Sequence, residues 1–567
     1  MRTPVLVLLT SAVLLLALGA GSALADTPAV QSADQSAKTG QSASSSANAE
    51  QIDPSNSVVD IRIGSPGDNG AIEQSNSNSA TSAAGNRAGT TQGASQASAG
   101  SGVQSAAQLA ATAQRASSAA KAVQVDPANE AVSIRIHSDG KDGPVSQSND
   151  NSAASRAGST AGTKQGVDQA SGGGGGGGGG VQDAEQSAST DQSAKSGAGA
   201  EQDHPSNEVV RIRIHSSGGN GDVKQSNSNS ADSSAANQAF TGQGAEQTQG
   251  GGGGTQYVGQ DATTAQSAAS AADAEQRHPS NSVESIRLHS PGDDGSISQS
   301  NDNQATSASG NTAKTGQSVL QDIGGSGSGH GVQASDQTAA TGQLAESQAK
   351  ARQDGASNSA GGVRIDSAGN GGSVEQSNSN AAQSKAGNAA DTLQFVGQSQ
   401  DATGGALRSD CSCSAGKDGK AVQAAGQSAS TKQGAKSGAA ALQSGASNLA
   451  DGVRKGSKGE DGAVLQSNDN AADSSAANTS GTQQSLRQAI GAAFGKLAVQ
   501  AAGQDAGTLQ GAASGAIALQ GAPGNATDPI RLDSTGGQGS SGQSNDNTGA
   551  SRAGSTGATL QELLQLL

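Results

Sequence analysis

The sequence has few of the residues that build an ordinary hydrophobic core. Its 567 residues include no Trp, one Tyr and three Phe, whereas Gly alone occurs 84 times. A large conventional core is therefore excluded, and low hydrophobicity with a net charge of −16 is the composition of a disordered chain. Order has to be argued from the pattern of the sequence, because the composition does not predict it.

Cysteine is nearly absent, and the two that occur are Cys411 and Cys413. One residue separates them, so they form no disulfide framework, and two sulfurs supply half of a tetrahedral metal shell. Three alternatives stay open for these cysteines: a disulfide bond between chains, a disulfide that closes a small strained ring, and two free thiols without a role. The acidic chain also lacks a basic patch, which argues against a nucleic-acid partner.

Long apolar runs occur once, at the amino terminus. Arg2 precedes an apolar run over residues 5–20, and Ala23-Leu24-Ala25 places small residues where a signal peptidase reads the chain. Residues 1–25 are therefore predicted to be a signal peptide, and the mature chain to be secreted or held at the cell surface. No other apolar run approaches 18 residues, so the mature chain is predicted to have no transmembrane helix.

Motifs that carry chemistry are absent as well. The sequence has no Gly-rich phosphate loop, nucleophile elbow, paired catalytic carboxylates or metal-ligand motif, so we expect neither an enzyme nor a cofactor or metal site. Histidines recur at two block positions, where stacking would give short imidazole columns that bind a metal ion, respond to pH or simply face solvent. We favour the solvated face. These residues are His137, His215 and His289 at one position and His204 and His278 at the other.

What the sequence does contain is a repeat of 66 residues, present seven times without insertion or deletion. Linkers of 7 to 24 residues, several of them Gly-rich, separate the blocks and are predicted to be loops that allow substantial disorder. Self-similarity at a fixed unit is the signature of a repeat architecture. The blocks comprise residues 31–96, 104–169, 182–247, 256–321, 333–398, 423–488 and 500–565.

Two arms of each block keep a strict period of two. Every second residue is mostly Gln, Asn, Ala, Ser or Thr and is never charged, whereas the intervening residues vary and carry the charges. This period predicts extended strands rather than helices, whose period is about 3.6. We expect the amides of the uncharged face to bond to identical amides on neighbouring strands as a structural ladder. The ladder residues of blocks one and three are Gln31, Gln35, Gln41, Gln51, Gln74, Asn76, Asn78, Asn86, Gln92, Gln96, Gln182, Gln186, Gln192, Gln202, Gln225, Asn237, Gln243 and Gln247.

The two arms of a block are mirror images, so that amide falls opposite amide when one arm is read backwards. Gln31 then meets Gln96, and Gln51 meets Asn76. Such a palindrome predicts a long antiparallel hairpin in which like side chains pair across the strands. Straight arms of about 20 residues would span roughly 70 Å, far more than usual, so arms that bend into the rungs of a solenoid are the alternative.

A short apolar hairpin tip is predicted in the middle of each block. In the alternation of the first arm, Ile61 and Ile63 occupy positions expected to face inward, and residues 65–70 supply a turn. Ile72 occupies an inward-facing position in the alternation of the second arm. The predicted fold class is thus all-β, a repetitive array of hairpins or solenoid rungs with Gln/Asn ladders and Gly-rich linkers. Buried amides are satisfied in a continuous stack, so blocks are expected to stack on one another or on other chains.

One part of each block resembles curlin, the subunit of a bacterial surface amyloid. Curlin repeats carry Ser or Asn followed by Gln six residues later, an interval kept here by Asn86 with Gln92 and by Asn237 with Gln243, and residues 74–80 look like its Gln, Asn and Ala cluster. The resemblance implies stacked β-arcs and an extracellular fibrous role. The unit here is much longer, and the aromatic and aliphatic positions of curlin are mostly Ala.

These features predict an exported, non-catalytic structural protein that self-associates through its amide faces into a cell-surface or extracellular fibre, layer or matrix. The alternatives are a monomeric β-repeat module that binds ice or a polysaccharide surface, and a secreted disordered low-complexity protein. Strand formation would exclude the disordered chain, and the oligomeric state would separate the other two.

Overall fold

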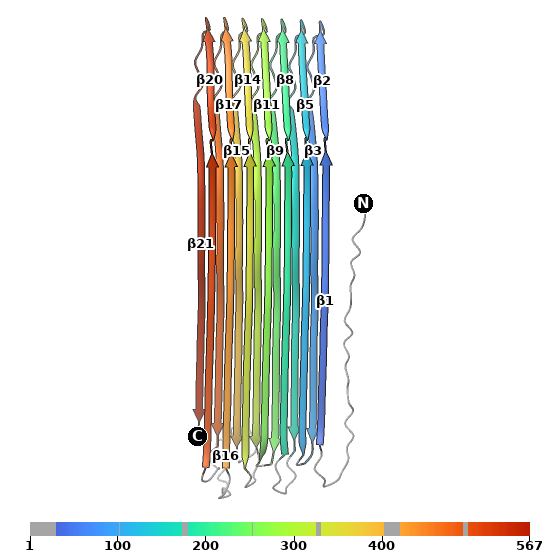
Figure 1. Ribbon diagram of the computed structural model, residues 1–567, viewed down its shortest axis with the longest axis vertical. Coiled ribbons are helices and arrows are strands. Elements are labelled where there is room, and N and C mark those ends of the chain that lie inside the picture. Colours follow the sequence, from blue (N-terminus) through green and yellow to red (C-terminus); the bar gives the residue numbers. More distant parts are fainter. Residues whose placement is uncertain are drawn as a thin grey trace.

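The computed structural model describes residues 30–100, 102–172, 180–251, 253–324, 330–401, 420–491 and 497–566. The seven blocks form seven rungs of a flat solenoid, whose long strands run the length of a slab while successive rungs lie side by side (Figure 1). The predicted signal peptide, Cys411 and Cys413 lie outside the described residues. Within the described ranges, no helix has the length and apolar character needed to cross a membrane.

Each rung contributes one strand to each of three seven-stranded sheets. Sheet A holds the first arms: β1 (Val30–Ile52), β4 (Val103–Val125), β7 (Gly180–Asp203), β10 (Gly254–Arg277), β13 (Gly331–Asp354), β16 (Lys420–Ser444) and β19 (Leu497–Gly521). Sheet B holds short strands near the tip: β2 (Ser55–Ile63), β5 (Ala128–Ile136), β8 (Ser206–Ile214), β11 (Ser280–Leu288), β14 (Ser357–Ile365), β17 (Ser447–Lys455) and β20 (Gly524–Leu532). Sheet C holds the second arms: β3 (Ile72–Ser98), β6 (Val145–Ser171), β9 (Val223–Gly250), β12 (Ile297–Gly324), β15 (Val374–Asp401), β18 (Val464–Ile490) and β21 (Ser541–Leu566).

Every strand pairs in parallel with the same strand of the next rung, so that residues at one block position form a straight column. Gln31 lies beside Gln104, and Gln104 beside Gln182, although the linkers between the blocks differ in length. In-register parallel pairing sets like beside like, which is what a side-chain amide needs in order to bond to its neighbour. We name each column by its member in rung one.

The predicted antiparallel hairpin is wrong, and the solenoid alternative is correct. The two arms of a block belong to different sheets, A and C, which face each other across the interior. The mirror symmetry therefore brings amides together between facing sheets rather than along one ladder of backbone bonds. Gln31 Nε2, for example, donates to the backbone oxygen of Ala97 at 2.9 Å.

Small side chains fill the interior between sheets A and C. The largest cluster is made of alanines, among them Ala122, Ala200 and Ala274, which are 0 to 2% exposed. Alanine buries little area, so each residue contributes little hydrophobic energy, but its small size lets the two sheets pack closely. Backbone hydrogen bonds and the amide columns therefore contribute more to the stability of this fold than the packing of large side chains does.

The predicted apolar tip is wrong in its parity. Asp53 adopts a left-handed φ of 51° between β1 and β2, and this turn transfers the inward face from odd to even positions. Ile61 and Ile63 consequently point outward, 57% and 65% exposed, and Arg62 takes the inward position. Ile72 does face inward, where it packs on an aliphatic cluster. A shift of one residue moves every following side chain of a strand to the other face.

Candidate functional site

The predicted ladders are hydrogen-bonded columns, and all are continuous except column 86, which Ser159 and Ser555 interrupt. Gln192 Nε2 donates to Gln114 Oε1 at 2.8 Å, and Gln266 Nε2 donates in turn to Gln192 Oε1 at 2.7 Å. Gln192 Nε2 also donates to the backbone oxygen of Gln238 in the facing sheet, at 3.0 Å. Gln192 is thus bonded along the stack and across it, so its burial leaves no polar group of its side chain unsatisfied. At the break in column 86, by contrast, Asn237 Oδ1 is buried without a partner among the described residues.

The ladder residues of blocks one and three all face the interior. Those of block three are buried: Gln182, Gln186, Gln192, Gln202, Gln225, Asn237, Gln243 and Gln247. In block one, the buried residues are Gln74, Asn76, Asn78, Gln92 and Gln96, and the half-buried residues are Gln31, Gln35, Gln41, Gln51 and Asn86. The residues of block one are more exposed than those of block three because rung one has a neighbouring rung on one side instead of two.

An asparagine column that the ladder prediction missed runs through sheet B at column 56. Asn207 Nδ2 donates to Asn281 Oδ1 at 2.8 Å and, across to sheet C, to Asn227 Oδ1 at 3.1 Å. Columns 56 and 76 therefore form one network that ties the two sheets together. The sequence does indicate this column, because every block has asparagine at this position. The asparagine lies at an even position, however, and even positions of this segment face inward only because of the turn at Asp53.

The glutamine and asparagine ladders run in opposite directions. Gln104 Nε2 donates to Gln31 Oε1, toward rung one, whereas Asn76 Nδ2 donates to Asn149 Oδ1, toward rung seven. Rung seven therefore ends in glutamine acceptors, and Gln500 Oε1 has no hydrogen-bond partner among the described residues. The two end rungs also present the outer edges of all three sheets, without a further strand among those described.

A column of arginines fills the tip of the solenoid. Three of them, Arg135, Arg213 and Arg287, are 0 to 1% exposed. Arg213 Nη1 donates to the carbonyl oxygen of Gly140 in the preceding rung at 2.9 Å, and Nη2 donates to that of Gly219 in its own turn at 3.1 Å. The guanidinium therefore joins the turns of successive rungs. The column consists of Arg62, Arg135, Arg213, Arg287, Arg364, Arg454 and Arg531.

Carboxylates bridge this column at every second rung. Asp142 Oδ1 lies 2.7 Å from Arg135 Nε, and Asp142 Oδ2 lies 2.8 Å from Arg213 Nη2. Each carboxylate thus spans two rungs and gives each arginine a charge-assisted bond, which is stronger than a neutral one. The bridges are Asp142 with Arg135 and Arg213, Asp294 with Arg287 and Arg364, and Asp461 with Arg454 and Arg531.

The bridges shift the titration of the buried groups. Burial alone would raise the pKa of Asp294, but the charges of Arg364 and Arg287 outweigh burial, and the pKa lies below its ordinary value. Burial lowers the pKa of Arg287 to about 10 despite the attraction of Asp294. A carboxyl whose folded pKa is depressed stabilises the fold above its unfolded pKa of about 3.9, and this contribution is lost as the pH falls through the folded value.

We expect Asp294→Asn to destabilise rungs four and five by about 3–5 kcal/mol at neutral pH, because Arg287 and Arg364 lose their counter-charge while they stay buried. Below the folded pKa of Asp294, the wild type loses the same charge, so the difference should disappear there. Denaturant midpoints at neutral and strongly acidic pH would measure both values. The control is Asp391→Asn, at an exposed position of β15, and an equal loss at both pH values would contradict the prediction.

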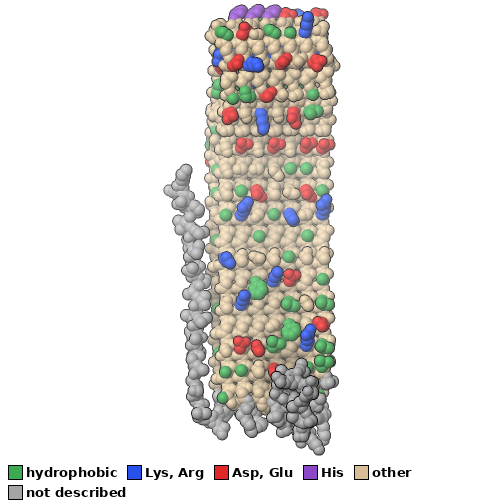
Figure 2. Space-filling model, turned by 180° about the vertical axis from the view of Figure 1, so that it is seen from behind, with side chains coloured by type: hydrophobic (Ala, Val, Ile, Leu, Met, Phe, Trp, Pro, Cys, Tyr) green, Lys and Arg blue, Asp and Glu red, His purple; other side chains and the backbone are tan. Residues whose placement is uncertain are grey.

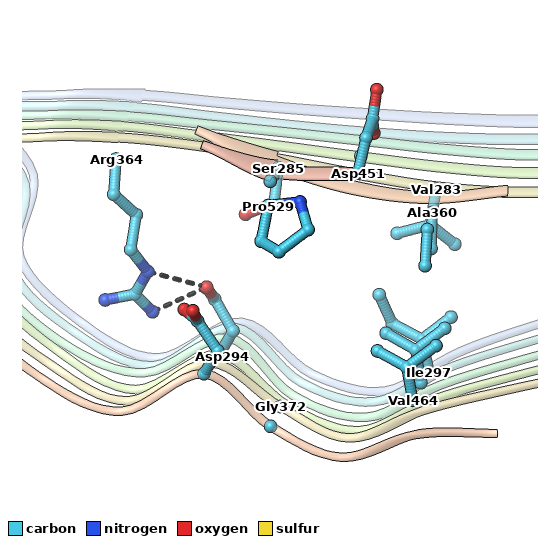
Figure 3. A pocket seen from close by; sticks show the side chains of 18 of the residues that line it. Val283, Ser285, Asp294, Ile297, Ala360, Arg364, Gly372, Asp451, Val464 and Pro529 are labelled. Atoms are coloured by element: carbon cyan, nitrogen blue, oxygen red, sulfur yellow. Dashed lines mark hydrogen bonds and ion pairs between the residues drawn. The ribbon is translucent and has the colours of Figure 1, made fainter. Parts of the chain in front are cut away.

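Beside the arginine column, the tip contains a cavity of about 140 Å³ (Figure 3). Val283 and Ala360 of sheet B and Ile297 and Val464 of sheet C form its apolar side, and Arg364 with Asp294 lies on the polar side (Figure 3). The space exists because the residues of column 60 have small side chains after rung three. Its members in rungs three to six are Arg211, Ser285, Gly362 and Gly452.

The recurring histidines form two stacked columns. The ring centroids of His137 and His215 are 5.1 Å apart, those of His215 and His289 are 5.0 Å apart, and those of His204 and His278 are 5.0 Å apart. Histidine side chains gather at the tip end of the slab, whereas charged side chains are scattered over the broad face (Figure 2). Among the described residues, no group of three or more His, Cys, Asp or Glu is placed to hold a metal ion.

These features define a parallel β-solenoid-like repeat protein whose interior contains side-chain ladders and whose end rungs have no further strand beside them among the described residues. Comparison of the chain with protein-family models, curated proteins and solved structures found no match. The function is therefore argued from the geometry of the rungs.

Proposed function

We propose that the protein is an exported structural subunit that assembles end to end into a fibre at the cell surface or outside the cell. The open end rungs carry the proposal, since each offers three sheet edges and an interrupted set of amide ladders to a further rung. An unpaired strand edge is a template for another chain unless it is shielded. The curlin-like spacing of Asn and Gln supports the same role.

The two ends complement each other rather than themselves. Rung seven ends in glutamine acceptors such as Gln500 Oε1. In rung one, Gln31 Nε2 donates across the interior to the Ala97 carbonyl but has no glutamine acceptor along its column among the described residues. Placing rung one of a second copy on rung seven continues each ladder in the direction in which it already runs. Such a head-to-tail contact between unlike ends does not close on itself, so it propagates into a fibre.

Charged side chains also permit this docking. When rung one follows rung seven in register, Arg62 and Arg531 are the one pair of like charges that share a column. That column already stacks arginines throughout the solenoid, and Asp60 accompanies Arg62 at 3.7 Å. Like charges directly opposite one another on neighbouring strands are destabilising, so their absence elsewhere favours the contact.

Site-directed cross-linking tests the arrangement. Glu50 of rung one and Leu519 of rung seven share an outward-facing column, so the two positions would lie about 4.8 Å apart between copies in a head-to-tail fibre. We expect the double variant Glu50→Cys/Leu519→Cys, with Cys411 and Cys413 changed to Ser, to give a series of covalent oligomers with a short bis-maleimide. Each single variant should stay monomeric on a denaturing gel.

Dimers from either single variant would contradict the head-to-tail order. A mature chain that sediments as a monomer at every concentration would contradict assembly itself, and is the result that the ice- or polysaccharide-binding alternative predicts. Fibre diffraction gives an independent measurement, with reflections expected at about 4.8 Å along the fibre and about 10 Å across it.

A further inference from the structure

The buried charges of the tip do not balance. Six arginines are at most 5% exposed: Arg135, Arg211, Arg213, Arg287, Arg364 and Arg454. Three carboxylates, those of Asp142, Asp294 and Asp461, lie among them, and each is shared between two arginines. The tip therefore buries an excess of positive charge in a chain whose net charge is −16. A buried charge is costly unless an opposite charge compensates it.

Arg211 is the buried arginine without a carboxylate. It is 4% exposed, and no acidic oxygen of the described residues lies within 4.0 Å of its guanidinium. Nη1 and Nη2 donate to the carbonyl oxygens of Gly221 and Gly143, but Nε has no acceptor among the described residues. Burial lowers the pKa of Arg211, although the charges of Asp142, Asp294 and Asp222 act in the opposite direction.

Ser285 follows Arg211 in column 60 and supplies a second unused donor. Its Oγ accepts a hydrogen bond from Asn220 Nδ2 at 3.0 Å, and its own hydroxyl hydrogen has no acceptor within the described part of the chain. Arg211 and Ser285 both line the cavity, Arg211 at the rung-three end. That end of the cavity therefore offers an N–H and an O–H to an acceptor that the protein itself does not provide.

The cavity continues from these donors along an apolar surface. In rung five, a Cβ placed on Gly362 would meet no atom within 4 Å, which shows that the inward side of this strand is open. Val283, Ala360 and Ile297 form the apolar side (Figure 3), and Pro529, exposed in the last rung, also lines the cavity. Apolar walls with a few placed polar groups are typical of sites for small organic ligands.

We propose that this cavity binds a short-chain carboxylate, whose carboxylate oxygens accept hydrogen bonds from Arg211 and Ser285 and whose carbon chain lies along Val283, Ala360 and Ile297. Its negative charge compensates the guanidinium of Arg211, and its chain covers the apolar wall. An alkylammonium of the same size would add positive charge to the excess, and an inorganic anion would leave the wall uncovered. The site is independent of fibre assembly, because it is built within one chain.

Butyrate is the probe, and calorimetric titration of the mature chain is the measurement. We expect saturable binding of butyrate, no binding of n-butylamine, and chloride at least about tenfold weaker than butyrate, a difference of about 1.4 kcal/mol. Arg211→Met, which keeps an unbranched apolar stem and removes the guanidinium, should weaken butyrate binding by about tenfold or more. Absence of butyrate binding to the wild type, or equal binding of chloride, would overturn the assignment.

Gly362→Leu locates the site without touching the donors. Its side chain would enter the cavity and should abolish butyrate binding, while strand dichroism stays unchanged because its Cβ meets no atom. The matched control is Gly316→Leu, an outward-facing glycine of β12 whose Cβ would also meet nothing within 4 Å, and this variant should bind butyrate as the wild type does. Undiminished binding by Gly362→Leu would place the ligand elsewhere and overturn the proposal.

Discussion

Gln192→Lys is expected to open the middle of rung three, with a loss of about 3–5 kcal/mol, the cost of burying an unpaired charge. Gln192 is completely buried between Gln114 and Gln266. An ammonium group has donors and no acceptor, so Gln266 Nε2 would lose its partner along the column. The inward residues on either side, Thr190 and Ala194, carry no opposite charge to compensate it.

Hydrogen exchange of the amides in β7 measures this effect. The control is Asp191→Lys, which places the same charge one residue away on the exposed side of the strand and should leave exchange unchanged. If the two variants exchanged at the same rate, the interior between sheets A and C would be open to water, and the ladder would not hold the rungs together.

The second large loss is expected from Gly295→Ala. A Cβ at this position would lie 2.3 Å from the carbonyl oxygen of Gly221 and 2.4 Å from its carbon, both backbone atoms of the preceding rung. No side-chain rotation relieves that overlap, so the rungs must separate locally, and we expect a cost of about 3 kcal/mol or more. Column 70 is glycine in every block, and in rungs two to seven a Cβ would make the same overlap with the preceding rung: Gly143, Gly221, Gly295, Gly372, Gly462 and Gly539.

Gly316→Ala is the matched substitution for comparison. Its Cβ would meet nothing within 4 Å, so relief of the entropic cost of glycine should raise stability, by up to about 1 kcal/mol. Denaturant midpoints of the two variants should therefore move in opposite directions. A Gly295→Ala midpoint at the wild-type value would show that the turns are not in contact from rung to rung.

The arms of the fold were predictable from the sequence because their period of two is unbroken. Parity alone assigns Gln192 and Ala194 to the interior, where both are buried. The palindrome of a block was ambiguous, since a hairpin and a pair of facing arches both run the two arms in opposite directions. What distinguishes them is whether a strand bonds to its own block or to the next, and one block contains no information on that choice.

The tip was not predictable, because one backbone angle decides it. The positive φ of Asp53 turns Arg62 inward and Ile61 outward, against the ordinary preference of both residues for the opposite environment. The arrangement is stable because turn carbonyls and shared carboxylates accept from the guanidinium groups, partners that appear when the rungs are stacked. A sequence pattern read within one block does not show them.

The spacing of the bridging carboxylates sets a constraint on how this protein can change in length. Since each of Asp142, Asp294 and Asp461 serves two rungs, the tip has a natural module of two blocks, although the sequence repeats after one. Within rungs two to seven, gene duplications or deletions that add or remove an Asp-bearing block together with the block after it would keep every guanidinium of the arginine column beside a carboxylate. Within rungs two to seven, an event involving one block would leave either a guanidinium without its carboxylate or a carboxylate with one arginine instead of two. Viable length variants of this part should therefore differ by even numbers of blocks.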